Sequence, residues 1–276
     1  MTKVRPDFRR ILLNLPHSRQ DYAAVGLIAE FADLFDVDLV GTYVDDVNLR
    51  SLAEIPNVRE FRAGYWQPLN SEQFAQDVAF AAREAERLFL ENASRHHSRL
   101  SFSSAMGADL QGAGIKDIIA LIEPNSAIER ATHQFMKSLE AAFRSTSSIL
   151  LVPGHAKQRL GPIIAIASGP DDPGIVAALA IASSTKERLI LVPSRPSLSL
   201  SSVVEKARTA GIATSLAKAA FHEGNLLLPA SVKGRLLVMD RKPLMERPAF
   251  SQTPTLLVSA ELSFRADVTN PKPKSR

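Results

Sequence analysis

Small and charged residues follow two apolar runs in the second half of the chain, and together they could bind an anion. Ser168 and Gly169 follow one run, and Asp240, Arg241 and Lys242 follow the other. Two cations beside a turn of small residues suit a phosphate or a carboxylate, because both anions accept charged hydrogen bonds. Ordinary solvated charges explain the same cations more simply. The anion site is therefore a hypothesis that needs a structure.

His17 and Ser18 are the corresponding polar pair in the first half, where they also follow an apolar run. His17 has no nucleophile at a suggestive spacing, so the pair predicts a ligand contact and no catalytic residue. The adjacent His96 and His97 lack carboxylate partners at metal-ligand spacing. The chain contains no cysteine, which excludes thiol catalysis and Cys-based metal sites. We expect no metal site.

Composition favours an ordinary soluble protein of two domains. The chain has 276 residues, 45% of them hydrophobic, which is enough for two domain cores. No apolar run approaches the roughly 20 residues that span a bilayer, and the amino terminus lacks a signal-peptide core. The net charge of +4 is scattered, and only 6% of residues are aromatic, so nucleic acid is not an expected partner. Together with the lack of cysteine, this predicts a cytoplasmic protein.

The first half of the chain is expected to alternate between strands and helices, and these elements would position its candidate site residues. Short apolar runs predict strands buried in a parallel sheet at 11–15, 39–44, 100–105, 117–122 and 148–152. Asn70 with Gln73 predicts the start of a long helix, and Ser126 with Glu129 predicts a second start. The buried face of that second helix is expected to be Ile128, Ala131, Phe135, Leu139 and Ala142. The stretch 45–69 reads as a long loop with one short helix.

The second half repeats this order in fewer residues. Strands are expected at 163–167, 189–192, 212–216, 236–239 and 255–259, with helices over about 173–186 and 201–210. Asp172 before Pro173 predicts a capped helix start, which is a structural role for the turn at Ser168. The prolines within 243–254 predict a loop where the first half has a helix. Domains are thus expected at 1–153 and 162–262, followed by a flexible tail over 263–276.

The order of these elements resembles the universal stress protein family. The resemblance is carried by the run Ile11 to Ser18, the strand Leu39 to Val44 followed by Asp45, and the strands at 117–121 and 149–152. It implies two tandem Rossmann-like α/β domains, each a mainly parallel five-stranded sheet with helices on both faces. Members commonly dimerise through the last strand, which implies an intramolecular pseudo-dimer here and allows a homodimer.

The resemblance also implies where a nucleotide would bind, and the sequence departs from that pattern. ATP-binding members carry an aspartate at the end of strand one and a glycine-rich loop after strand four. The first position holds Pro16 in one half and Ser168 in the other. After strand four, the halves read Glu123-Pro124-Asn125-Ser126 and Asp240-Arg241-Lys242-Pro243, without that glycine spacing. We therefore expect no cofactor, although ATP stays open.

These observations predict a non-catalytic, stress-related protein that binds an unidentified protein or small-molecule partner, without a membrane. Two alternatives stay open at this stage. One is a nucleotide-binding protein or nucleotide hydrolase that uses the loops of the second half. The other is a nucleic-acid binder driven by the basic pI of about 9.4.

Overall fold

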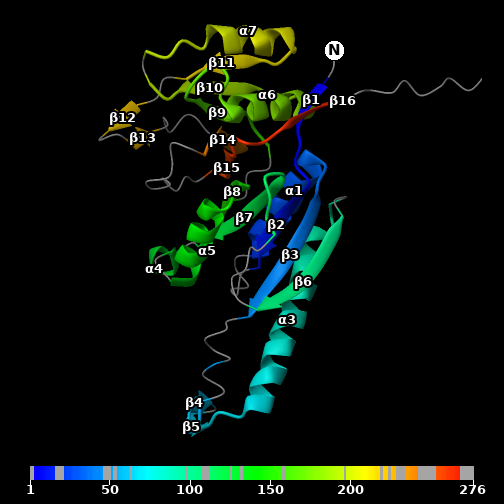
Figure 1. Ribbon diagram of the computed structural model, residues 1–276, viewed down its shortest axis with the longest axis vertical. Helices are drawn as coiled ribbons and strands as arrows, with labels where there is room; N and C mark the ends of the chain where they lie inside the picture. Colours follow the sequence, from blue (N-terminus) through cyan, green and yellow to red (C-terminus); the bar gives the residue numbers. More distant parts are fainter. Residues whose placement is uncertain are drawn as a thin grey trace, which may run out of the picture.

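The computed structural model describes residues 3–15, 22–45, 51, 55–62, 64–96, 99–106, 112–124, 126–130, 133–156, 160–195, 197–217, 220–222, 225–227, 234–241 and 253–267. Ten strands form one sheet in the order β11-β10-β9-β14-β15-β8-β7-β2-β3-β6 (Figure 1). The first half supplies β2 (Arg10–Asn14), β3 (Asp38–Asp45), β6 (Leu100–Met106), β7 (Asp117–Glu123) and β8 (Ser148–Pro153). The second half supplies β9 (Ile163–Ala167), β10 (Leu189–Pro193), β11 (Thr214–Leu216), β14 (Leu236–Asp240) and β15 (Thr255–Val258).

Both halves of the sheet have the same strand order, and they meet at their last strands. Counted within each half, the strands run 3-2-1-4-5 from the outer edge inward, and all pairs within a half are parallel. The junction is the antiparallel pair β8–β15, in which Leu150 lies opposite Leu256. The fold is thus mixed α/β with a mainly parallel sheet, as the sequence predicts.

Helices cover both faces of the sheet. One face carries α1 (Tyr22–Phe35), α3 (Ser71–Ala93), α6 (Pro173–Thr185) and α7 (Ser201–Thr209), and the other carries α5 (His133–Arg144). Alternation of strand side chains explains this division, because Ile118 and Leu150 face α1 whereas Ile119 and Ile149 face α5. The central strands are buried on both faces, which is why their sequences are continuous apolar runs.

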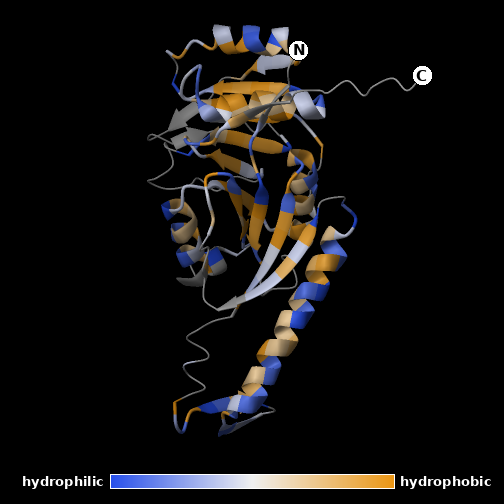
Figure 2. Cartoon of the chain, turned by 45° about the vertical axis from the view of Figure 1, so that its right-hand side comes forward, coloured by the Kyte–Doolittle hydropathy of each residue, from blue (hydrophilic) through white to orange (hydrophobic). Residues whose placement is uncertain are grey.

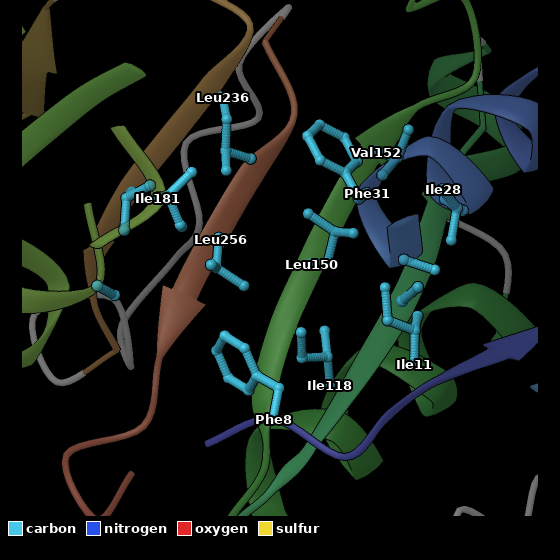
Figure 3. Close-up of a cluster of buried hydrophobic side chains, with 14 of the residues drawn as sticks. Phe8, Ile11, Ile28, Phe31, Ile118, Leu150, Val152, Ile181, Leu236 and Leu256 are labelled. Carbon is cyan, nitrogen blue, oxygen red and sulfur yellow. The ribbon is translucent and has the colours of Figure 1, made fainter. Parts of the chain in front are cut away.

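The two halves share one hydrophobic core at the junction. In Figure 3, Phe31 of α1 lies beside Leu150 and Val152, and Ile181 of α6 lies beside Leu236 and Leu256. All six side chains belong to one cluster and are at most 2% exposed. The predicted boundary between the halves is therefore bridged by common packing, although each half keeps its own strand order.

A buried ion cluster also crosses the junction. Arg235, which precedes β14, bonds to Glu30 of α1 at 2.6 Å and to Glu187 after α6 at 3.0 Å. All three side chains are less than a fifth exposed. Removing one member of such a buried cluster leaves charge uncompensated, so the cluster favours one arrangement of the halves.

Part of the segment predicted to be a flexible tail, 263–276, is a strand. Residues 264–267 form β16 (Phe264–Asp267), which pairs antiparallel with β1 (Lys3–Pro6) next to α6 (Figure 1). The Asp7 amide also donates to the Ser263 carbonyl at 2.9 Å. Backbone pairing with a distant strand has no local sequence signal, so this segment reads as a tail. Residues 268–276 lie outside the described residues.

Three further local predictions can be compared with the structure. Asn70 does cap α3, because its side chain accepts from the Glu72 and Gln73 amides. The predicted loop at 45–69 contains a hairpin, β4 (Arg59–Arg62) with β5 (Tyr65–Pro68). Phe135, Leu139 and Ala142 are buried as expected, but Ile128 is 83% exposed. It lies in a separate short helix, α4 (Ala127–Arg130), and so does not share the buried face of α5.

The second half also contains a small hairpin of β12 (Ala220–His222) and β13 (Asn225–Leu227). Among the described residues, no helix is both long and apolar enough to cross a membrane.

Candidate functional site

Ligands in parallel α/β sheets bind beyond the carboxyl ends of the strands. Because β8 and β15 are antiparallel, the strands of the two halves point in opposite directions, and the sheet has two such ends. We call the carboxyl ends of β2 and β7 the first mouth, and those of β9 and β14 the second mouth. Of the sequence-predicted site residues, the structure describes Ser168, Gly169, Asp240 and Arg241, and all four lie at or just beyond the carboxyl ends of β9 and β14, at the second mouth.

The second mouth is closed by a carboxylate of the chain itself. One oxygen of Asp172 accepts from the Ser168 amide at 2.8 Å and from the Ser168 hydroxyl at 2.7 Å. The other oxygen accepts from the Gly174 amide at 2.7 Å, which caps α6 as the sequence predicts. Asp172 is buried. The helix terminus that would attract a phosphate is thus already paired with an anion.

Close packing narrows the second mouth further. A Cβ on Gly174 would lie 2.7 Å from the Asp240 nitrogen and 2.7 Å from the Met239 carbonyl carbon. The first turn of α6 therefore rests directly on the backbone of β14. Gly169 differs, because a Cβ there would meet nothing within 4 Å. Asp240 itself is buried at the end of β14.

The side chain of Arg241 binds residues of the first half of the chain. Its guanidinium donates to the carbonyls of Ala142, Phe143 and Ser147, at the carboxyl end of α5 and just beyond it. It also lies over the Phe143 ring, 5.8 Å from the ring centre. Burial lowers the pKa of Arg241. The helix carbonyls are satisfied by this cation, so Arg241 is a capping residue across the junction.

The predicted anion site is therefore only partly assembled. Ser168 is bonded to Asp172, and Arg241 is bonded to α5, so the structure gives these two residues separate structural roles. His17, Ser18 and Lys242 lie outside the described residues. Within the described part of the chain, no group of three or more His, Asp or Glu side chains is placed to hold a metal ion.

The first mouth contains a buried carboxyl that can change its charge near neutral pH. Glu123 is the last residue of β7 and is 7% exposed. Burial raises the pKa of Glu123 from 4.5 to about 7, against the opposing effect of Arg130. The Arg130 Nε lies 3.8 Å from the nearer Glu123 oxygen, and its Nη1 donates to the Pro124 carbonyl at 3.1 Å.

The Glu123 carboxyl and the Arg130 guanidinium form the best candidate site in the described residues. A titrating group with a perturbed pKa at the end of a strand is a recognised marker of a functional site. The sequence shows Glu123 only as a fixed negative charge that repels phosphate. Nothing in the sequence identifies Arg130 as a neighbour of Glu123, because their approach depends on how the chain passes from β7 to α4. A glutamate at the end of a continuous apolar run is the one clue in the sequence to the raised pKa.

Comparison with solved structures identifies this architecture. A universal stress protein from Archaeoglobus fulgidus superposes with a TM-score of 0.61 at 9% identity, over 91% of this chain and 98% of that one. The chain has the universal stress protein fold. A protein of unknown function from Pseudomonas aeruginosa matches over 91% of this chain and 92% of its own, with a TM-score of 0.43 and 15% identity. No protein-family model and no curated protein matches the sequence.

The universal stress protein fold was implied by the sequence resemblance, and the comparison confirms it at the level of fold. Two of the residues at which the sequence departs from the ATP-binding pattern of that family, Ser168 and Arg241, are described at the second mouth. Ser168 is bonded to Asp172, and Arg241 is bonded to the Ser147 carbonyl.

Proposed function

We propose that this protein acts without catalysis, in a stress-related role, by binding a small ligand or a protein partner. The observation that carries the proposal is the carboxylate of Asp172 on the amino end of α6. A nucleotide phosphate at the second mouth would have to displace that carboxylate or accept repulsion from it. Either cost argues against ordinary ATP binding there.

The ligand site is proposed at the first mouth. Glu123 accepts or donates a hydrogen bond according to its protonation state, and Arg130 supplies a fixed positive charge. This combination suits a ligand with both a donor and an acceptor group. A polyphosphate would suit it less, since the ionised Glu123 carboxylate repels it.

The two halves are proposed to act together as an intramolecular pseudo-dimer. The antiparallel β8–β15 pair and the shared packing of Phe31 with Leu150 support this view. The two mouths would then be held at fixed positions on one sheet, with the proposed ligand site at the first mouth.

Isothermal titration with ATP and magnesium tests the proposal. We expect no saturable heat and no phosphate release for the wild type, at about pH 6 or about pH 8, on either side of the pKa of Glu123. Native mass spectrometry of freshly purified protein would then search for a co-purifying molecule. A retained molecule that is lost in Glu123→Gln but kept in Arg241→Lys would place the ligand at the first mouth. Saturable ATP binding with turnover would instead establish the nucleotide hydrolase alternative.

A further inference from the structure

One part of the molecule projects away from the sheet. Figure 1 shows α3 running past the edge of the sheet to β4 and β5, which lie at its far end. The buried residues of α3 are Ala85, Phe89 and Ala93, all in its second half. We call residues 55–62 and 64–83 the arm. The arm therefore has little contact with the core.

The hairpin of β4 and β5 has a polar face that contacts α3. Cross-strand pairing puts Glu60 and Gln67 on one face, joined by a hydrogen bond of 2.9 Å. Arg62 shares that face and forms an ion pair with Asp77 of α3 at 3.2 Å. The hairpin is thus attached to its own helix by exposed polar contacts, which contribute little to stability.

The opposite face of the hairpin carries an aromatic pair. Phe61 and Trp66 lie directly opposite each other, with ring centres 5.5 Å apart in an edge-on arrangement. Phe61 is 63% exposed and Trp66 is 61% exposed. A two-stranded hairpin with its apolar face in water is at best marginally stable. Within the described residues, nothing covers this face, so a partner would stabilise it.

We propose that the arm binds the arm of a second copy of this chain, related by a two-fold axis. Two further large side chains of the arm, Ile55 and Phe80, are each more than half exposed. Tyr65 is opposite Arg62 and so lies on the polar face of the hairpin. At about 200 Å² for a fully exposed side chain of this size, Phe61, Trp66, Ile55 and Phe80 expose roughly 480 Å² per copy. Mutual burial would then cover roughly 960 Å², close to the ~1,000 Å² expected of a specific interface, which suits a dimer that dissociates on dilution.

Charge favours a second copy over an oppositely charged partner. The arm contains three arginines, Arg59, Arg62 and Arg83, and three carboxylates, Glu60, Glu72 and Asp77. Its net charge is therefore zero, and two identical arms meet without net repulsion. A membrane with anionic lipids would attract a basic patch, which this arm lacks. Exposed Phe, Tyr, Trp and Arg are also the side chains that are enriched at interfaces.

Analytical ultracentrifugation of the full chain across a dilution series tests the proposal. We expect a species of twice the 30.0 kDa chain mass that dissociates on dilution. Trp66 is the only tryptophan, so its fluorescence should shift to the red over the same concentrations. The double variant Phe61→Ser/Trp66→Ser should raise the dissociation constant at least about 100-fold, because each substitution acts twice in a two-fold dimer.

Two controls separate the arm from general effects. Leu216→Ser removes an apolar side chain that is also 63% exposed but lies on β11, and it should leave the dimer intact. Phe80→Glu places a good helix former on the exposed part of α3 and should dissociate the dimer without disturbing the hairpin. Circular dichroism checks the fold of each variant.

Three results would overturn the proposal. They are a monomer at every concentration, a dimer that survives both arm variants, and a dimer that salt alone dissociates. The last result would point to ion pairs as the main attraction, whereas an uncharged aromatic contact should persist at high ionic strength.

Discussion

The two mouths of the sheet lie beyond strands of the same order, yet their polar groups are used differently. At the second mouth, Asp172 caps α6 and Arg241 caps α5, so both charges have partners within the chain. At the first mouth, Glu123 is buried beside Arg130 at 3.8 Å, and burial raises the pKa of Glu123 to about 7. The charged groups of the second mouth are thus bonded within the chain, whereas the first mouth contains a carboxyl whose charge can change near neutral pH.

This difference gives the described charges of the second mouth structural roles and leaves the proposed ligand binding to the first mouth. One of the groups that join the two halves comes from the second mouth, where Arg241 binds residues almost one hundred positions earlier in the chain. A mouth that performs this structural role cannot also present the same groups to a ligand. We therefore expect substitutions at the second mouth to affect stability, and substitutions at the first to affect pH response and binding.

Gly174→Ala should have the largest effect. The added Cβ would lie within 3 Å of three backbone atoms of β14, so α6 must move away from the sheet. We expect a loss of about 2–3 kcal/mol in the free energy of unfolding, despite the better helix propensity of alanine. Chemical denaturation measures it. Gly169→Ala is the matched control in the same turn, and it should change stability by less than about 0.5 kcal/mol. Equal effects at the two positions would show that the mouth is not closed by packing.

Asp172→Ala should lower the free energy of unfolding by less than Gly174→Ala does, by about 1–2 kcal/mol, because it removes one helix cap. The substitution also frees the amides of Ser168 and Gly174. Inorganic phosphate should then raise the melting temperature of the variant at constant ionic strength, but not that of the wild type. Asp172→Asn, which keeps one acceptor for the cap, is the control and should lose less stability. A wild type that phosphate stabilises equally would contradict the closed second mouth.

The sequence predicts the sheet well because its central strands are buried on both faces. The apolar run at 163–167 coincides with β9, and the predicted strand at 148–152 falls within β8. Local capping signals also succeed, at Asn70 and at Asp172, because a cap involves residues only two to four positions apart. These features depend on short-range physics that is visible in the sequence.

The sequence fails where a residue's role is set by a distant part of the chain. Arg241 reads as an exposed cation, but its partners Ala142 and Ser147 lie 99 and 94 positions away. Phe264–Asp267 reads as a tail because its partner strand is at the other end of the chain. Glu123 reads as a permanent charge, since the burial that raises its pKa follows from tertiary packing. The contrast between the mouths was therefore only partly predictable.

Glu123→Gln should have the smallest effect, and it tests the first mouth directly. In the unfolded chain this carboxyl should titrate near its ordinary pKa of 4.5, whereas in the folded chain burial raises the pKa to about 7. The folded state thus binds the proton more tightly. Its contribution to stability is complete below about pH 4.5 and is lost as the pH rises through about 7.

Glutamine stays neutral at every pH, so the variant should lack this loss. Between about pH 5 and pH 8, the unfolding free energy of the wild type should fall by about 1 kcal/mol relative to Glu123→Gln, with Arg130 and nearby solvent reducing the full effect. Urea denaturation at both pH values measures the difference. Glu140→Gln, on the exposed side of α5, is the control and should leave the pH dependence unchanged. If the unfolding free energies of Glu123→Gln and of the wild type depend on pH in the same way, the carboxyl of Glu123 is already ionised in the folded chain. The first mouth would then lack a group whose charge changes near neutral pH.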